Sequence, residues 1–323
     1  METQVNRNAE VGDGKPPIPQ LPKAKLKALS AVSPARSAAK LFLYFGALIT
    51  FGVAIELSPS WPVQLGFQLL MGLLFAHGLE LQHELLHRNM LRSSRLSRLF
   101  GVLVGAPMLV SFTHYKIQHL HHHRKVGTDQ DAEIFGYDAS QLTTVPGFVA
   151  RAWNLSRIPA FALTLIGIAQ NSYPELATSK RLKSNLRTEY LLLGALATAG
   201  AVAVIQLQAT TILNVWFVPW LVFGELFHFL IELPEHIGCD RSDPNPLRNT
   251  RSYKTTAFWS YVANGNNFHI EHHLWPSIAI HNLREAHRYI SEARAEHIET
   301  SLRAALASVW RATRRSNKEL HQS

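Results

Sequence analysis

Residues 61–87 read WPVQLGFQLLMGLLFAHGLELQHELLH, an apolar stretch that ends in a run of ionisable side chains. Its first part, Trp61–Leu81, is long enough to cross a bilayer, since a transmembrane helix needs about 17–25 apolar residues. At 100° per residue, five ionisable side chains fall within an arc of about 120°: His77, Glu80, His83, Glu84 and His87. Such groups cost roughly 2.5–3.5 kcal/mol each near the bilayer centre. The pattern predicts a helix that protrudes from the membrane and presents a polar face to a site.

Three further stretches have the same length and apolar character: Ser37–Leu57, Thr188–Gln208 and Ile212–Leu233. The last of these continues into a second polar face: Glu225, His228, Glu232 and His236. Pro234 is expected to kink or end this helix before His236. Leu99–Phe112 contains Gly105-Ala106-Pro107 and is predicted to be a re-entrant or interfacial helix, and Pro159–Ala169 to lie at the membrane surface.

The positions of the basic residues predict the topology. All 32 Lys and Arg residues lie in 1–40, 82–187 and 234–323, and none lies in the two pairs of apolar stretches between them. By the positive-inside rule, both termini and the central segment are cytoplasmic, and the chain crosses the membrane four times. We therefore expect an all-α integral membrane protein, with four transmembrane helices in two hairpins and a cytoplasmic helical cap.

The chain divides into three predicted parts. Residues 1–36 are expected to form a polar, basic tail, disordered to about Lys27 because it holds little apolar surface. Residues 37–290 form the membrane domain, and 291–323 a basic C-terminal helix or tail. A single helix is expected over Asn282–Arg315. The net charge of +9 favours anionic lipid or an acidic protein partner and not nucleic acid, because the basic residues do not interleave with aromatic ones.

Clusters of histidine residues are the feature of the sequence that indicates a metal site. His83-Glu84-Leu85-Leu86-His87 is followed by two clusters of the form His-x-x-His-His, which have the same helical spacing. Imidazoles at this density, without cysteine thiolates, suit iron, zinc or copper. Eight histidines exceed the ligand set of one metal, so two metals are predicted. His121 points away at helical spacing. The eight candidate ligands are His83, His87, His119, His122, His123, His269, His272 and His273.

Other functions remain open at this point. The first cluster matches a zinc hydrolase pattern in which Glu84 is the general base, but such an enzyme needs only one further ligand. A tract that binds metal adventitiously, or a protein that stores or senses metal, needs no catalysis. Two clusters with identical spacing on one predicted side of the membrane argue against an adventitious tract.

The succession of three histidine boxes between two apolar pairs resembles the integral-membrane fatty acid desaturase and hydroxylase superfamily. Arg124–Asp131 after the second box, Leu274–Ile278 after the third, and Glu235-His236-Ile237-Gly238 are similar to the bacterial acyl-lipid branch. The resemblance covers about residues 37–290. It implies a ninth ligand, His236, with Glu232 one turn earlier near or on a metal.

Three further residues are candidates for supporting roles. His228 is a weaker candidate ligand, and its alternative role is a polar residue that lines a substrate tunnel. Asp129 and Asp131 are candidates to accept hydrogen bonds from ligand imidazoles, which fixes the imidazole tautomer. The alternative for both aspartates is an ordinary turn.

The resemblance also implies the reaction. Two iron ions activate O2 and remove hydrogen from an acyl chain held in an apolar tunnel, which gives a double bond. The same site hydroxylates or ketolates a carotenoid, alkane or other apolar lipid if oxygen is inserted instead. Because the sequence contains no nicotinamide or flavin fingerprint, electrons are expected from a separate carrier, ferredoxin or a b5-type cytochrome. The expected location is a bacterial inner membrane.

Overall fold

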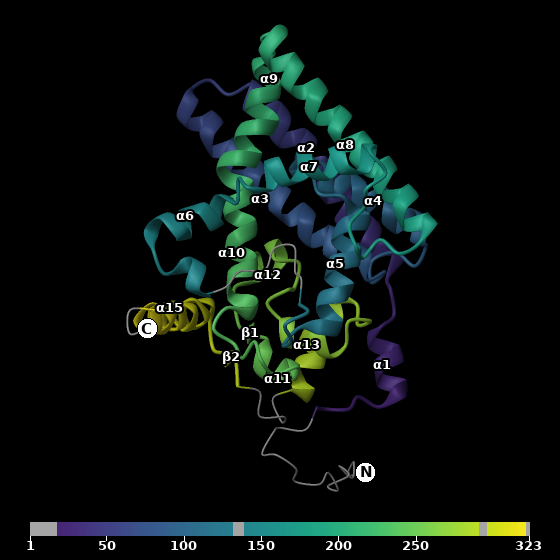
Figure 1. Ribbon diagram of the computed structural model, residues 1–323, viewed down its shortest axis with the longest axis vertical. Helices are drawn as coiled ribbons and strands as arrows, with labels where there is room; N and C mark the ends of the chain where they lie inside the picture. The colour runs from purple at the N-terminus through teal and green to yellow at the C-terminus, as the bar shows by residue number, and fades with distance from the viewer. Residues whose placement is uncertain (1–17, 132–138, 291–295, 321–323) are drawn as a thin grey trace, which may run out of the picture.

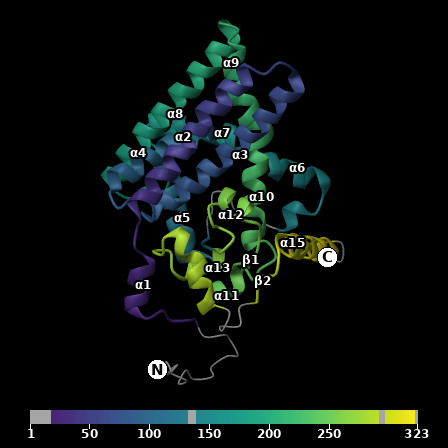
Figure 2. The same ribbon diagram turned by 180° about the vertical axis from the view of Figure 1, so that it is seen from behind.

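The computed structural model describes residues 18–131, 139–290 and 296–320, and the chain there is mostly helical. Four helical segments of the described chain are long and apolar enough to cross a membrane. They include the four expected apolar stretches almost entirely, and two bent helix pairs raise the number to six if each pair is one span. The four segments are Lys23–Glu56, Trp61–Leu86, Lys180–Gln206 and Thr210–His236. Figures 1 and 2 show the long helices bundled at one end of the molecule.

Helices α2 (Pro34–Glu56) and α3 (Trp61–Leu86) are joined by a short loop and pack together. Each has a proline in its first turn, where a missing N–H breaks no helical hydrogen bond. Helix α3 also approaches the last span very closely at Gly72, where a Cβ atom would lie 2.4 Å from the Cβ of Phe223. The absence of a side chain at Gly72 therefore permits this contact.

The stretch after the first histidine box is broken, as expected for a re-entrant or interfacial segment. Helix α4 (Ser94–Gly105) and the short η1 (Ala106–Met108) are bent by 98° relative to α5 (Phe112–Lys125). The bend falls at Leu109, whose φ of 54° lies in the left-handed region. The break turns α5 toward the end of α3, and α5 carries the second histidine box.

A buried carboxylate fixes the start of α5. Glu189 of α8 (Lys180–Gln206) is 1% exposed and accepts hydrogen bonds from Arg98, Ser111 and Thr113. Ser111 is the N-cap of α5, and its hydroxyl also accepts from the His114 N–H. This network joins α4, α5 and α8, and no sequence motif had indicated it.

The middle of the chain forms shorter helices, and the two longest of them expose apolar side chains. They are η2 (Ala139–Leu142), α6 (Val145–Trp153) and α7 (Arg157–Ala169). Val145 on α6 and Leu163 on α7 are largely exposed, as are Phe42 and Ile49 on α2. Exposed apolar residues on α2, α6 and α7 are consistent with a lipid environment. Helix α7 covers the predicted segment Pro159–Ala169, and its position at the membrane surface stays a prediction.

The last span contains two π-helical segments. It runs from α9 (Thr210–Ile212) through η3 (Leu213–Phe217) and η4 (Pro219–Gly224) into α10 (Glu225–His236). Of the two expectations for Pro234, the end of the helix is wrong, because α10 continues through Pro234 to His236. A kink there stays a prediction. The side chain of Arg251 donates to the Pro234 carbonyl, which gives this last turn an additional polar contact.

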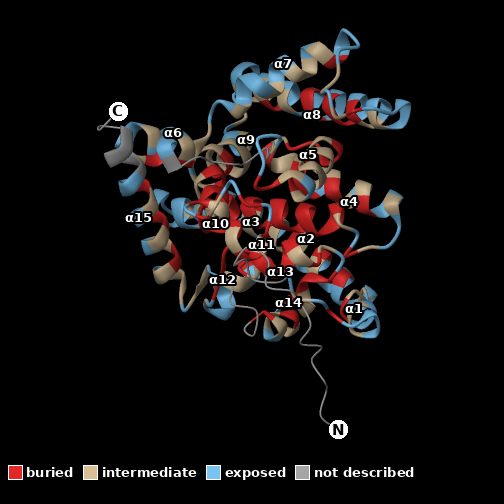
Figure 3. Cartoon of the chain, turned by 60° about the horizontal axis from the view of Figure 1, so that its bottom comes forward, coloured by how far each residue is buried: buried red, intermediate tan, exposed pale blue. Residues whose placement is uncertain are grey.

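Residues 246–320 form a second region, which we call the C-terminal lobe. Figure 1 shows it beside the lower ends of α5 and α10. Buried residues concentrate where the lobe meets α3 and α10 (Figure 3). Its elements are α11 (Pro246–Asn249), β1 (Ser252–Tyr253), α12 (Ala257–Val262), α13 (His269–Leu274), η5 (Ile280–Asn282), α14 (Leu283–Ala286), η6 (His287–Tyr289), β2 (Ile298–Glu299) and α15 (Leu302–Leu320).

The structure corrects the predictions for the ends of the chain. Helix α1 (Lys23–Leu29) lies inside the predicted disordered segment. Leu21 and Leu29 are buried against the C-terminal lobe, and Lys25 pairs with Glu285. The single helix expected over Asn282–Arg315 is wrong, because β2 interrupts it and pairs in parallel with β1. This two-stranded pair also departs from the all-α prediction. Residues 1–17 lie outside the described chain.

Candidate metal centre

Four helices bring the histidine boxes together. The first box is at the end of α3, the second on α5, the third on α13, and His236 is the last residue of α10. Asn89, just after the first box, donates to the carbonyls of Pro276 and Ile278 just after the third. Hydrogen bonds from this side chain to the backbone therefore join the segments that follow the two boxes, in addition to the contacts between the histidine rings.

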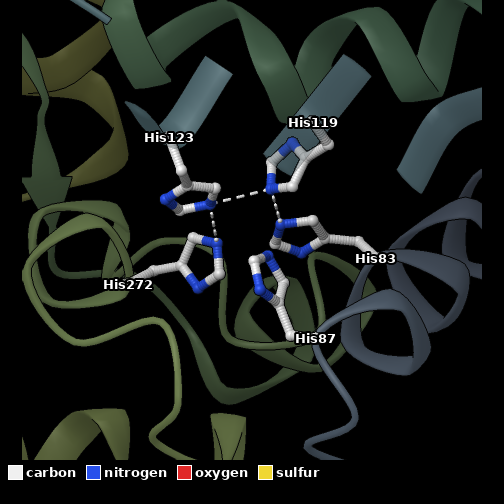
Figure 4. Close-up of side chains that lie close together, drawn as sticks. All are labelled: His83, His87, His119, His123 and His272. Carbon is white, nitrogen blue, oxygen red and sulfur yellow. Dashed lines mark hydrogen bonds between the residues drawn. The ribbon is translucent and has the colours of Figure 1, made fainter. Parts of the chain in front are cut away.

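Five imidazoles form the first group. Its members are His83, His87, His119, His123 and His272, and Figure 4 shows that their rings converge. The Nε2 atom of His119 lies 2.9 Å from Nε2 of His83 and 2.9 Å from Nε2 of His123. The Nε2 atoms of His123 and His272 are 3.0 Å apart. The group draws one or two residues from each of the three boxes.

The other four predicted ligands form a second group. His236 lies at its centre: its Nε2 atom is 3.2 Å from Nε2 of His122 and 3.1 Å from Nε2 of His269. The Nε2 atoms of His273 and His269 are 3.2 Å apart. His123 and His273 stack with ring centroids 4.3 Å apart, so the two groups are adjacent. All nine predicted histidines thus lie in one continuous cluster.

The nitrogen positions fit metal ions. Nitrogen ligands about 2.0–2.1 Å from a metal lie ~2.9–3.4 Å apart at right or tetrahedral angles, and the observed separations fall in this range. The Nε2 atom of His87 is buried and has no hydrogen-bond partner in the described chain. A buried nitrogen without a partner is costly unless something binds it, and a metal ion would do so.

Hydrogen bonds at the Nδ1 atoms orient three imidazole rings of the second group. His122 donates from Nδ1 to Asp131 at 2.8 Å, and His236 donates from Nδ1 to the Asn249 carbonyl at 2.9 Å. His269 is bonded through Nδ1 to the amide oxygen of Asn266 at 3.2 Å. A proton held on Nδ1 leaves the Nε2 lone pair free for a metal. Asp131 therefore has the contact that the sequence suggested, whereas Asp129 is exposed.

Burial favours the neutral imidazole. In α13, burial and then the neighbouring histidines lower the pKa of His269, His272 and His273 well below the usual value. Neutral imidazole is the form that binds metals. These residues are therefore ready to act as ligands at neutral pH.

The weaker candidates form a separate cluster beside the second group. His228 Nε2 lies 3.7 Å from Glu232 Oε1 and 3.8 Å from Glu80 Oε1. Glu232 also lines a cavity of about 10 Å³ together with His83, His122 and His236. This volume suits about one water-sized molecule. Glu232 therefore lies beside the candidate ligands, whereas His228 lies beside Glu232 and does not line this cavity.

Two carboxylates near the site had no assigned role in the sequence. Glu235 is buried, its Oε2 lies 3.2 Å from His269 Nε2, and it accepts from Asn266. Glu271 lies between the histidines of the third box, accepts from Ser252 and pairs with His287. Glu235 immediately precedes His236, and Glu271 lies inside the third box. Their positions in the sequence next to candidate ligands could have indicated that both lie near the site.

Glu84 does not face the histidines as the zinc hydrolase hypothesis requires. Its carboxylate pairs with Lys40 of α2 at 2.9 Å and accepts from Asn264 at 3.1 Å. Lys40 also donates to Asn264, which closes a three-residue network. Glu84 therefore joins α2, α3 and the C-terminal lobe.

A bundle of apolar helices that holds buried, converging histidines defines a membrane-type protein with a candidate histidine-ligated metal centre. The fatty acid desaturase family model matches residues 59–301, and the chain belongs to that family. Membership in this family supports an oxidoreductase activity.

Curated relatives carry related names at low identity. The chain is 21% identical to the sn-1 oleoyl-lipid 12-desaturase of Picosynechococcus sp., over 83% of this chain and 80% of the relative. It is 24% identical to the sn-1 acyl-lipid omega-3 desaturase (ferredoxin) of Nostoc sp., over 84% and 80%. The dihydrorhizobitoxine desaturase of Bradyrhizobium elkanii is 23% identical, over 64% and 61%.

Proposed function

We propose that this protein is an O2-dependent membrane desaturase that introduces a double bond into a fatty acyl chain, either lipid-linked or carried as an acyl thioester. The observation that carries the proposal is the convergence of nine imidazoles in two adjacent groups within a fatty acid desaturase fold. Two groups of nitrogen ligands suit two metal ions, and the family favours iron.

The reaction balances with an external source of electrons. Two hydrogen atoms leave adjacent carbons, and with O2, two electrons and two protons they give the alkene and two water molecules. Two iron ions would supply the reduction of O2 and the removal of hydrogen from an unactivated C–H bond. The ferredoxin in the name of the Nostoc relative supports a ferredoxin-like donor for this chain, and a b5-type cytochrome is the alternative.

The residues of this chain would hold and orient that centre. His83, His87, His119, His123 and His272 are proposed for one iron, and His122, His236, His269 and His273 for the other. Asp131, Asn249 and Asn266 keep the ring nitrogens in the binding tautomer. Glu232 is proposed to hold a water molecule or to bind the second metal directly, because it lines the cavity beside His122 and His236. Burial of the cluster keeps bulk water away from the reacting atoms.

The proposed topology has four crossings, with both termini and the histidine cluster on the cytoplasmic side. The distribution of basic residues supports it, as do the four long apolar segments. A bacterial inner membrane is the proposed location, because the compared relatives are bacterial.

Two other activities are less well supported. Hydroxylation or ketolation of a carotenoid, alkane or other apolar lipid would use the same centre and differ only in how the substrate is held. A zinc hydrolase would need Glu84 free to activate water, but Lys40 and Asn264 occupy its carboxylate.

The test is lipid analysis after expression in a host whose membrane contains only saturated chains. We expect new unsaturated acyl chains that require O2 and iron. His122→Ala and His272→Ala should each abolish them, whereas His121→Ala should not, because His121 bonds to the Gln130 carbonyl and belongs to neither group of imidazoles. Unsaturation that persists in either of the first two variants, with normal protein levels, would contradict the proposal.

A further inference from the structure

Helix α15 has two unlike faces. Its inner face buries Ala305, Val309 and Thr313, and Val309 and Leu306 belong to the same apolar cluster as Phe229 and Leu233 of α10. Its outer face exposes five larger side chains: Arg303, Trp310, Arg311, Arg314 and Arg315. A helix whose apolar side is already packed on protein keeps only its polar side for a partner.

The outer face of α15 carries unpaired positive charge. Within the described chain, none of its four arginines forms an ion pair. Trp310 is 62% exposed, and the guanidinium of Arg314 lies 5.4 Å from its ring centroid. Arginine and tryptophan are enriched at protein interfaces, where one large ring and several charges give both contact area and steering.

This face is close to the second group of histidines. Helix α15 packs on the loop that follows His236: a Cβ atom at Gly238 would lie 2.5 Å from the Cβ of Ala312. Arg251 also joins α15 to α10, because it donates to the Pro234 carbonyl of α10 and to the Ser308 hydroxyl of α15. Only α15 itself, about 10 Å across, separates its outer face from the segment that carries His236. Figure 1 shows α15 beside the lower end of α10.

The alternative partner is the membrane surface, and the structure favours a protein. A helix that lies in a bilayer interface inserts its apolar face into lipid. In α15 that face is occupied by α10 and its neighbours, so Trp310 is the only large apolar side chain left among the described outward residues. Charge complementarity with an acidic surface is then the main available attraction.

We propose that the outer face of α15 (Arg303, Trp310, Arg311, Arg314 and Arg315) is the docking surface for an acidic one-electron carrier. This inference rests on the proposed desaturase function. Each docked carrier would be oxidised by one electron and would pass it inward past Gly238 and His236. Two successive dockings therefore supply the two electrons needed for one double bond.

The test uses the full protein in nanodiscs and a reduced plant-type [2Fe–2S] ferredoxin. The variant is Arg311→Glu/Arg314→Glu. Its control is Arg95→Glu/Arg284→Glu, which makes the same charge change at two other exposed arginines. We expect the KM for ferredoxin to rise about tenfold or more in the variant and to change less than about twofold in the control. Binding of oxidised ferredoxin to immobilised nanodiscs should weaken in parallel. A single turnover driven by dithionite should be unchanged.

The readouts separate this inference from the proposed function. If dithionite gives no product in any form of the protein while ferredoxin binding still depends on Arg311 and Arg314, the desaturase proposal fails and the docking surface stands. If KM and binding match the control, the docking surface is overturned. It is also overturned if the defect occurs only in nanodiscs with anionic lipid and vanishes in neutral ones, because the face then binds the membrane.

Discussion

Asp131 shows how a single residue outside the proposed ligand set can orient a candidate ligand, in this case His122. Its Nδ1 hydrogen bond to Asp131 fixes which ring nitrogen carries the proton. Partial burial alone would raise the pKa of Asp131, but the hydrogen bond from His122 and nearby positive charge together outweigh it, and the pKa is lowered. Asp131 therefore stays ionised at neutral pH and keeps the ring in the tautomer that binds metal.

Asp131→Ala should weaken metal binding at the second group by roughly 10–100-fold, the usual effect of removing such an acceptor. The measurement is iron content after dialysis against a graded series of chelator concentrations. Asp129→Ala is the matched control, because Asp129 is exposed and two residues away. Equal iron retention in the two variants would show that the hydrogen bond to His122 does not matter.

Glu84→Gln should leave turnover within about twofold of the parent and lower the free energy of unfolding by about 1–2 kcal/mol. The substitution removes the charge that pairs with Lys40, a group about one fifth exposed, but keeps the side-chain shape. Product formation and the thermal midpoint in detergent are the two measurements. Loss of turnover in a stable protein that retains its metal would instead support Glu84 as a catalytic base.

At the scale of elements, the centre depends on how closely the helices that carry it approach one another. Helix α3 and the last span contact at Gly72, and their lower ends carry His83, His87 and His236. A change in their separation would displace ligands of both groups at once. We therefore expect Gly72, which lies about three helical turns before His83, to influence the spacing of the proposed ligands.

Gly72→Val should separate α3 from the last span, because a Cβ atom there lies 2.4 Å from Phe223 Cβ and 2.6 Å from the Pro219 carbonyl oxygen. Overpacking of this kind costs about 1–3 kcal/mol. Gly66→Val on the same helix is the control, since a Cβ atom there meets nothing within 4 Å. Size-exclusion profiles and iron content should deteriorate only for Gly72→Val. Equal behaviour of both variants would mean that this contact is not critical.

Sequence patterns were most informative where a periodic signal was strong. The apolar stretches predicted the long segments, box spacing predicted eight of the histidines that gather, and the family resemblance implied the ninth, His236. Sequence alone did not predict the network around Glu189, because its partners lie 76 or more residues away and form no local pattern. Leu21 and Leu29 were missed for the same reason: a polar segment with few apolar residues docks only because the lobe offers a matching apolar surface.

At the scale of the whole molecule, a bundle with exposed apolar side chains is joined to a lobe that covers the histidine cluster. The proposed ligands lie on α3, α5, α10 and α13, so a bound metal centre would tie the bundle to the lobe. Binding of metal to the folded state would also stabilise the whole protein, because a preformed site does not exist in the unfolded chain.

Metal content and Mössbauer spectroscopy of the purified protein, from cells grown on ⁵⁷Fe, test the central claim most directly. The account predicts about two iron ions per chain, in two nitrogen-rich environments, with both lost in His122→Ala/His272→Ala and retained in His121→Ala. One zinc ion per chain without iron, or iron that persists in the double variant, would contradict it.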